Sequence, residues 1–409
     1  MSAKAPVDTA PGPRPASAAS ARTASAPTPA ATTAWVRPPR LALHSGSTPL
    51  EVSSFTFDLL RDLEPRTLGV TYWFDAAPEG APYCVRVHFS GRLRGQPTPG
   101  QSRRFTALAT VEDVLPGSGR IAVTTRIPDL PPGTWDVTAT AVAPAPEGSG
   151  ADWVSVNDPQ LPSGTASGTT AFGPVVNVLA PGVRLWAWPA LVGTGTVLAL
   201  VIQSLLASRL QLPLRRLLPL SLVACVLGLL GAKAYYVATH RREWRGLLTP
   251  GLSVQGFVLV AIATLIGGSL LLGLPSGSVL DTTAPGLLFA LAVGRFGCLL
   301  GGCCAGRPTR SGWGIWSSNR RLGVRRVPVQ LMESALAGVL GALAFWAVLL
   351  LGTSAGGLVF IAGFAVYTAA RQLLFPFRDI PRTTTRGPKL ILGAASAAAL
   401  AATAVLLLR

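Results

Sequence analysis

Seven polar residues interrupt the long apolar segments in the second half of the chain, and they are the first candidates for chemistry. They are Lys233, Gln255, Asp281, Arg295, Glu333, Tyr367 and Arg371. Polar side chains within a membrane span are costly, so they are functional candidates by default. A guanidinium stays charged when partly buried and binds a pair of phosphate oxygens, so Arg295 and Arg371 predict a phosphodiester site. Glu333 would balance their charge.

Structural interpretations compete with this one. Lys233 and Arg371, taken singly, fit equally well the alternative of extending to a head-group layer. Glu333 fits simple neutralisation of an arginine equally well. The case for function is strongest at Arg295, because the glycines around it allow a ligand or another backbone to approach.

Three cysteines follow Arg295 in the stretch LAVGRFGCLLGGCCAGRPT, namely Cys298, Cys303 and Cys304. Without a neighbouring histidine they make a poor zinc set, because structural zinc sites normally take four ligands. A disulfide from Cys298 to either of the others stays open as an alternative on an oxidising side of a membrane. We interpret the three mainly as small packing residues beside glycine, and we expect neither a metal nor a cofactor.

The composition is that of a membrane protein. Of 409 residues, 49% are hydrophobic and 13% are charged, against about 25% charged in a soluble domain. The net charge of +17 suits anionic lipid head groups or nucleic acid about equally. The apolar spans favour lipid, and we expect no nucleic-acid partner.

Three zones follow one another along the chain. Residues 1–45 are rich in Ala, Pro and Ser and predict a disordered tail; the tail resembles a transit peptide, but a low-complexity tail is the favoured interpretation. Residues 46–180 contain short alternating runs such as LGVTYWF and RIAVTTRI, separated by Pro/Gly-rich turns. They predict an all-β immunoglobulin/fibronectin-like sandwich for binding or spacing, with an unknown partner. Cys84 within it has the character of a small buried residue.

Residues 181–409 predict a mainly α polytopic membrane bundle of about seven transmembrane helices. The fourth contains Arg295 and several glycines, so we expect it to be partly re-entrant. The predicted spans lie near 185–207, 217–239, 252–273, 283–302, 328–351, 355–374 and 389–408.

Four motifs carry a family resemblance over roughly 185–409. They occur in the segments DTTAPGLLFALAVGRFGCLLGGCCAGRPT, RRVPVQLMES and YTAARQLLFPFR, which resemble the bacterial prolipoprotein diacylglyceryl transferase family. The resemblance implies a multi-pass enzyme of the bacterial plasma membrane. It would move the diacylglyceryl group of phosphatidylglycerol onto the lipobox cysteine thiol in a prolipoprotein signal peptide, forming a thioether and releasing glycerol phosphate.

The resemblance also assigns roles to residues. Arg295 falls on the arginine of the family's GR motif, and Arg371 on the arginine four residues after Tyr367; both would hold the phosphate and stabilise the departing anion. Glu333 falls on the glutamate of the family's QLYE motif, and Asp281 on the aspartate upstream of the arginine; both would serve in positioning and charge balance. The residues expected to line the phospholipid are Asp281, Gly294, Gly297, Tyr367 and Lys233.

The chain departs from the family at its HGG motif, where Gln255 replaces the histidine and Phe257 the second glycine. Glutamine cannot accept a proton as imidazole does, and a thiol nucleophile benefits from a base. His240 could substitute, although a surface histidine is the favoured interpretation. The tyrosine of the family's QLYE motif is also replaced, by Met332. These changes affect turnover more than binding, although Gln255 still completes the expected catalytic set with the two arginines and the glutamate.

Three hypotheses follow. The first is a diverged diacylglyceryl transferase, and the second is a non-catalytic or repurposed phospholipid- or lipoprotein-binding paralogue. The third, a transporter or lipid-scrambling protein, requires inverted repeats that the hydropathy lacks.

Two signals disagree about topology. The family orientation places the chain's N-terminus and the catalytic arginines outside. The positive-inside rule instead assigns the loop with Arg320, Arg321, Arg325 and Arg326 to the cytoplasm, and the sandwich with it. We favour the family orientation, because arginines that bind substrate are not topology signals.

Overall fold

The computed structural model describes residues 48–53, 63–95, 103–144, 153–156, 158, 160–239, 253–380 and 386–408. The predicted tail and His240 lie outside these residues, as does FTFDLL at 55–60, another of the short alternating runs between 46 and 180, so the predictions for them are untested.

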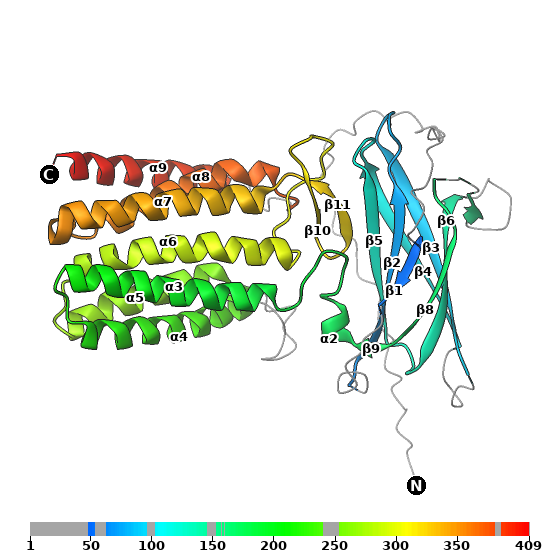
Figure 1. Cartoon of the computed structure of the whole chain (residues 1–409), viewed down its shortest axis with the longest axis horizontal. Helices are drawn as coiled ribbons and strands as arrows, with labels where there is room; N and C mark the ends of the chain where they lie inside the picture. The colour runs from blue at the N-terminus through cyan, green and yellow to red at the C-terminus, as the bar shows by residue number, and fades with distance from the viewer. Residues whose placement is uncertain are drawn as a thin grey trace, which may run out of the picture. The chain divides into compact units, whose positions relative to one another are not determined.

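Two antiparallel sheets form the first folded part of the chain (Figure 1). The first has the order β1-β2-β5-β11-β10, with β9 also on β2, and the second has the order β4-β3-β6-β7, with β8 also on β6. The first sheet comprises β1 (Leu50–Val52), β2 (Arg66–Asp75), β5 (Arg120–Pro128), β9 (Ala171–Phe172), β10 (Ile315–Ser318) and β11 (Leu322–Arg326). The second comprises β3 (Tyr83–Leu93), β4 (Arg104–Val114), β6 (Thr134–Pro144), β7 (Trp153–Ser155) and β8 (Gly164–Thr169). The predicted β-sandwich is confirmed.

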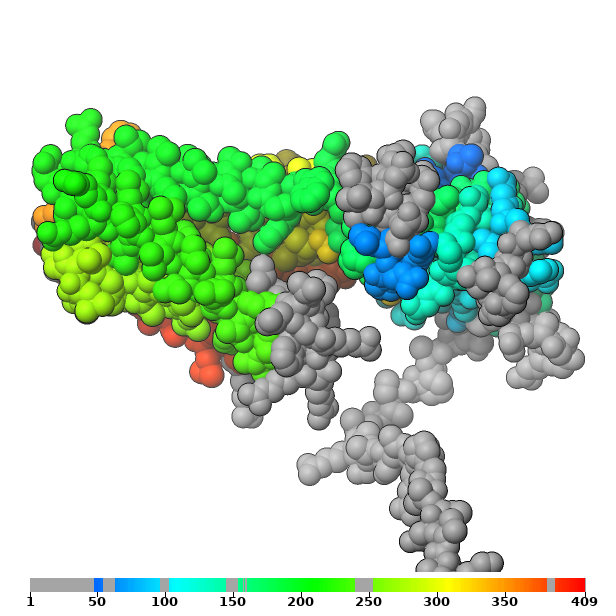
Figure 2. All heavy atoms as spheres, turned by 90° about the horizontal axis from the view of Figure 1, so that it is seen from below, coloured from blue at the N-terminus to red at the C-terminus, as the bar shows by residue number. Residues whose placement is uncertain are grey.

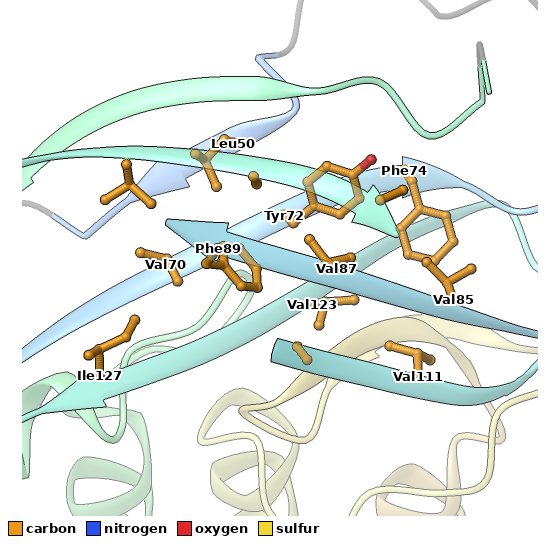
Figure 3. Close-up of a cluster of buried hydrophobic side chains, with 14 of the residues drawn as sticks. Leu50, Val70, Tyr72, Phe74, Val85, Val87, Phe89, Val111, Val123 and Ile127 are labelled. Carbon is orange, nitrogen blue, oxygen red and sulfur yellow. The ribbon is translucent and has the colours of Figure 1, made fainter. Parts of the chain in front are cut away.

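Alternate residues of these strands fill the space between the sheets (Figure 3). Val70 and Tyr72 of β2 and Val87 and Phe89 of β3 are all fully buried, as the period of two along a strand requires. Cys84 is only half-buried, so the expectation of a buried residue there is met in part.

The hairpin β10–β11 comes from the loop between two membrane helices, yet it extends the first sheet of the sandwich. Leu322 of β11 pairs with Val123 of β5, and Val324 belongs to the sandwich core at 3% exposure. Trp316 stacks on Trp73 with 5.8 Å between ring centroids. The sheet is therefore completed by residues far beyond the boundary predicted near 180.

Seven helices of the described residues are long and apolar enough to cross a membrane, which confirms the predicted bundle. They are α3 (Ala187–Arg209), α4 (Leu214–Thr239), α5 (Val254–Leu271), α6 (Ser276–Leu300), α7 (Val329–Leu351), α8 (Leu358–Leu374) and α9 (Arg386–Leu407). A short helix α2 (Gly173–Val176) precedes them, and the 3-10 turns η1 (Gly352–Ala355) and η2 (Phe375–Phe377) follow α7 and α8. The chain is a multi-pass membrane protein.

Helix α6 corrects one expectation. It is continuous from Ser276 to Leu300 and begins seven residues before the predicted span at 283, so it is not re-entrant. Its contact with α3 depends on glycine: a Cβ on Gly286 would lie 2.5 Å from the Ala199 carbonyl oxygen. Close packing of this kind is typical of helices in membranes.

The outer surface of the bundle is apolar. Figure 2 shows one face, over which the green side chains of α3 and α4 spread. Large exposed apolar residues on these two helices include Val201 and Leu205 on α3 and Leu222 and Leu230 on α4. Such side chains suit contact with lipid tails rather than water.

Candidate functional site

A buried carboxylate joins two arginines at one end of the bundle. The Oε2 atom of Glu333 on α7 forms an ion pair of 2.8 Å with Nε of Arg295 on α6. Its Oε1 atom accepts a hydrogen bond from Arg378, which follows η2. Glu333 is fully buried, and Arg295 and Arg378 are 9% and 3% exposed. Two cations on one anion leave this trio with a charge of +1.

The segment after α8 is held where Arg378 can reach Glu333. The backbone N–H of Arg307 donates to the Phe377 carbonyl at 2.8 Å, and the N–H of Asp379 donates to the Ala305 carbonyl at 2.9 Å. Gly306 forms an isolated antiparallel β-bridge with Arg378. Gly306 has no room for a side chain, because a Cβ there would collide with the Val327 carbonyl. The GRPT turn therefore positions the second arginine.

Arg326 on β11 connects the hairpin to the GRPT turn and to the segment after α8. Its guanidinium is fully buried and donates to the Gly306 carbonyl at 2.9 Å and to Asp379 Oδ2 at 2.7 Å. Burial lowers the pKa of Arg326, and pairing with Asp379 opposes that effect. Another residue counted as a loop charge in the sequence, Arg320, donates to the Gly301 carbonyl at 2.8 Å. Both arginines therefore have structural partners.

Helix α8 supplies two more groups. Tyr367 is 5% exposed and lies within electrostatic reach of Arg295. Arg371, one turn further along α8, is half-buried and lies within electrostatic reach of Arg295, Arg378 and Glu333. Four predicted site residues thus meet at one place. We call Arg295, Glu333, Tyr367, Arg371 and Arg378 the arginine cluster.

Asp281 is not in this cluster. It lies 14 residues before Arg295 on α6, or about 21 Å along the helix axis at 1.5 Å per residue. Its fully buried carboxylate accepts hydrogen bonds from the N–H groups of Gly357 at 2.6 Å and Phe360 at 3.0 Å. It therefore caps the helix that carries Tyr367 and Arg371.

Gln255 and Lys233 also lie on other elements. Gln255 is exposed in the first turn of α5, and Lys233 is half-buried on α4 with its ammonium 5.9 Å from the Tyr236 ring centroid. These two helices pack mainly on each other, whereas the cluster is carried by α6, α7, α8 and the segment after α8.

The two predicted glycines differ. A Cβ on Gly297 would lie 3.2 Å from Cα of Trp188 on α3, so Gly297 permits helix packing. Around Gly294, apart from its two chain neighbours and the adjacent backbone of α6, no atom of the described residues lies within 4 Å of the position a Cβ would take. Gly294 thus leaves space one residue from Arg295.

The sequence interpretation missed Arg378, although the quoted segment YTAARQLLFPFR ends on it. The motif spacing singled out Arg371, and nothing in the spacing says that the chain turns back after η2. A second arginine directly after the FPF turn was the available signal.

The three cysteines also converge beside the cluster. Their Sγ atoms all lie within 4.8 Å of one another, and the Arg295 guanidinium donates to Cys298 Sγ at 3.9 Å. All three are free thiols.

Comparison with known proteins identifies the family of the chain. A family model described as prolipoprotein diacylglyceryl transferase matches residues 174–408, more than half of the chain. The chain is 30% identical over 178 residues to phosphatidylglycerol–prolipoprotein diacylglyceryl transferase 2 of Clostridium perfringens, covering 40% of this chain and 68% of that protein.

Two shorter matches carry the same name without the number. The protein of Dehalococcoides mccartyi is 36% identical over 97 residues, covering 21% of this chain and 37% of the relative. That of Chloroflexus aggregans is 32% identical over 104 residues, covering 23% of this chain and 33% of the relative. These matches and the family model confirm the resemblance read from the motifs, and the chain belongs to the prolipoprotein diacylglyceryl transferase family.

Proposed function

We propose that this protein transfers the diacylglyceryl group of phosphatidylglycerol to the lipobox cysteine thiol of a prolipoprotein signal peptide. The acceptor sulfur forms a bond to the terminal glyceryl carbon, and the bond from that carbon to the phosphate oxygen breaks. The electron pair stays on the oxygen, so glycerol phosphate departs and a thioether remains. The thiol proton is released.

The observation that carries the proposal is the charge of the arginine cluster. Arg295, Arg371 and Arg378 against Glu333 sum to +2, in a place where apolar helices surround them. A phosphodiester carries one negative charge, and the departing phosphate monoester gains a second. A site with fixed charge of +2 therefore favours the leaving group more than the substrate, which is the condition for lowering a barrier.

The residues of the arginine cluster have different roles in this reaction. Arg295 and Arg378 are fixed by Glu333, so their remaining N–H donors are already oriented when the lipid arrives. Arg371 lies beside them and provides the further positive charge. The space at Gly294 admits the phosphate next to Arg295. Asp281 and the GRPT turn support these groups from outside the site.

A second candidate is a protein that binds the same lipid or a lipoprotein without turnover, and Gln255 favours it. A neutral amide stands where the family has a base, and the structure puts Gln255 on the exposed first turn of α5. Gln255→His separates the candidates. A large gain in transfer would show that the missing base limits an enzyme, whereas strong lipid binding with no transfer in either form would favour a binding protein.

For topology we propose the family orientation, in a bacterial plasma membrane, with the arginine cluster and the sandwich on the outer side. The partners found for Arg320 and Arg326 support this orientation, because these side chains are used within the fold. Accessibility of single introduced cysteines in the sandwich to a membrane-impermeant reagent in spheroplasts tests it. Labelling only after lysis would contradict the outer location.

The direct test of function is mass spectrometry of a lipobox peptide incubated with the purified full-length protein and phosphatidylglycerol. The expected result is a diacylglyceryl mass increase on the cysteine. Arg295→Ala should abolish it while the protein stays in the membrane. The matched control is Arg310→Ala, which removes the same charge from an exposed loop position. Equal transfer by wild type and Arg295→Ala would refute the assignment of the site.

A further inference from the structure

The three-cysteine cluster has the dimensions of a metal site. A tetrahedral zinc–thiolate site with Zn–S bonds of about 2.3 Å needs sulfurs about 3.8 Å apart. The Sγ atoms of Cys298, Cys303 and Cys304 lie within 4.8 Å of one another. Small side-chain rotations therefore suffice to close the set around one ion.

The backbone is bent to bring these sulfurs together. Helix α6 ends at Leu300, Gly301 is its C-cap, and Gly302 takes a φ of +63°. The N–H of Cys303 then donates to the Cys298 carbonyl at 3.0 Å. Cys304 has a φ of +54°, a left-handed conformation that is uncommon for a residue with a side chain. Such strained residues concentrate at functional sites.

The turn is tied to the family motif on α7. The Gln330 amide donates to the Cys303 carbonyl at 3.2 Å. Gln330 itself is 2% exposed and lies one turn before Glu333. The cysteine turn and the carboxylate of the arginine cluster are therefore positioned by the same helix.

The charges on the two groups are complementary. Three thiolates with one divalent ion carry −1. Arg295 donates to Cys298, and Arg295 and Arg378 both lie close enough to act electrostatically on Cys304. An outer-shell cation of this kind stabilises a thiolate-rich metal site. With a bound phosphodiester, the −1 of the metal site and the −1 of the lipid balance the +2 of the arginine cluster.

We propose that Cys298, Cys303 and Cys304 bind one Zn²⁺ ion and leave its fourth position open to the acceptor thiol. Three protein ligands with one exchangeable position are the arrangement of catalytic rather than structural zinc. The sequence disfavoured zinc because a fourth ligand was missing. In this proposal the substrate supplies it.

The activation step rests on the proposed function. Coordination lowers the pKa of a thiol, so the acceptor S–H loses its proton to water without a protein base. The sulfur electron pair forms the S–C bond, the C–O bond breaks towards phosphate, and the resulting neutral thioether is a weaker ligand that leaves. The Zn²⁺ ion is unchanged. This route gives a role to the cysteines in a chain that has Gln255 in place of the family histidine.

The test begins with metal binding, which needs no activity. Purified full-length protein, reduced and freed of metal, is titrated with Co²⁺ as a spectroscopic probe. We expect one Co²⁺ per chain, with thiolate-to-cobalt charge-transfer absorption and tetrahedral ligand-field bands. Cys303→Ser should weaken binding at least about tenfold. The matched controls Cys84→Ser on β3 and Cys225→Ser on α4 should leave it unchanged.

Three outcomes overturn the metal site. The first is the absence of thiolate-to-cobalt absorption, and the second is the same titration curve for wild type and Cys303→Ser. The third is a mass spectrum of the protein as isolated, without reductant, that is lower by two hydrogens and so shows a disulfide at Cys298. The transfer assay then separates the two proposals. Cobalt binding without transfer in any metal form refutes the transferase and keeps the metal site. Transfer that persists undiminished in metal-free protein and in Cys303→Ser refutes the role for zinc and keeps the transferase.

Discussion

From the pairing of two arginines with Glu333 we predict that one substitution lowers stability and at the same time strengthens the preference for an anionic lipid. Glu333→Gln keeps the shape of the side chain and removes its charge. The trio changes from +1 to +2, and the whole arginine cluster, with Arg371, from +2 to +3. The protein should become less stable, yet its preference for an anionic lipid should grow.

The magnitude follows from burial. Glu333 is fully buried and pairs with both guanidinium groups, and its Oε2 atom lies 2.8 Å from Nε of Arg295. Removing one partner of a buried ion pair costs about 3–5 kcal/mol, because the remaining charge is left without compensation. An independent figure agrees: two unit charges at about 4 Å interact by about 4 kcal/mol at an effective dielectric constant of 20. For a domain of this size the loss corresponds to a fall of roughly 6–20 °C in the unfolding midpoint.

The assay is thermal unfolding of the purified full-length protein in detergent with added lipid. Phosphatidylcholine should stabilise wild type and Glu333→Gln alike. Phosphatidylglycerol should restore a larger part of the midpoint in the variant than it adds to wild type, since its phosphate replaces the lost negative charge. The control Glu112→Gln removes an exposed carboxylate from β4 and should change stability by less than about 0.5 kcal/mol.

Two results would refute this reasoning. One is a Glu333→Gln midpoint within about 1 °C of wild type in phosphatidylcholine, which would mean that the carboxylate does not compensate the arginines. The other is an equal gain from phosphatidylglycerol in both proteins, which would mean that the anion binds elsewhere.

Three further predictions concern contacts that hold together the helices and the sheet around the site. Asp281→Asn weakens the cap on α8 and should cost about 1–3 kcal/mol, seen as a lower unfolding midpoint and faster exchange of the Gly357 amide; an unchanged exchange rate there would exclude the capping role. Trp316→Ala removes a stacked ring that contributes about 0.5–1.5 kcal/mol beyond its buried area. It should speed hydrogen exchange of the Thr124 amide, which donates to the Arg321 carbonyl of the hairpin at 2.7 Å. Protection of this amide equal to wild type would show that the stack does not hold the sheet together. Gly286→Val places a side chain against the α3 backbone and should prevent accumulation of the folded protein, measured by fluorescence-detected size exclusion; a normal monodisperse peak would contradict the close α3–α6 contact.

Much of this architecture was predictable from local patterns. Apolar length alone located all seven spans, because lipid imposes that length on each helix separately. The period of two located the main strands of the sandwich. The association of Arg295, Glu333, Tyr367 and Arg371 was predictable only through the motifs, since these residues lie on three different helices.

What was missed depends on tertiary contacts. Arg378 reaches Glu333 because the GRPT turn pairs with the segment after α8, and neither segment's own sequence shows that pairing. The predicted span began at 283, after Asp281, whereas α6 begins at Ser276 and includes this carboxylate. In the structure that carboxylate is satisfied by two N–H groups of another helix.

The hairpin is the clearest case, and it changes how the sandwich should be understood. A run with Arg320, Arg321, Arg325 and Arg326 reads as a charged loop, yet it contains two strands that complete a sheet. Val324, in the middle of β11, belongs to the sandwich core. Two residues further along the same strand, Arg326 donates to the carboxylate of Asp379, the neighbour of Arg378.

A continuous set of contacts therefore runs from the sandwich through β11 and Arg326 to the segment that carries Arg378. Removing the sandwich would expose the core face of β11 and loosen the support of Asp379, so it would disturb the arginine cluster even if the sandwich binds nothing. A loss of transfer on deleting the sandwich thus cannot by itself demonstrate that the sandwich recruits acceptor proteins. Surface substitutions on the second sheet, which leave β5 and β11 paired, are the changes that isolate a recruiting role.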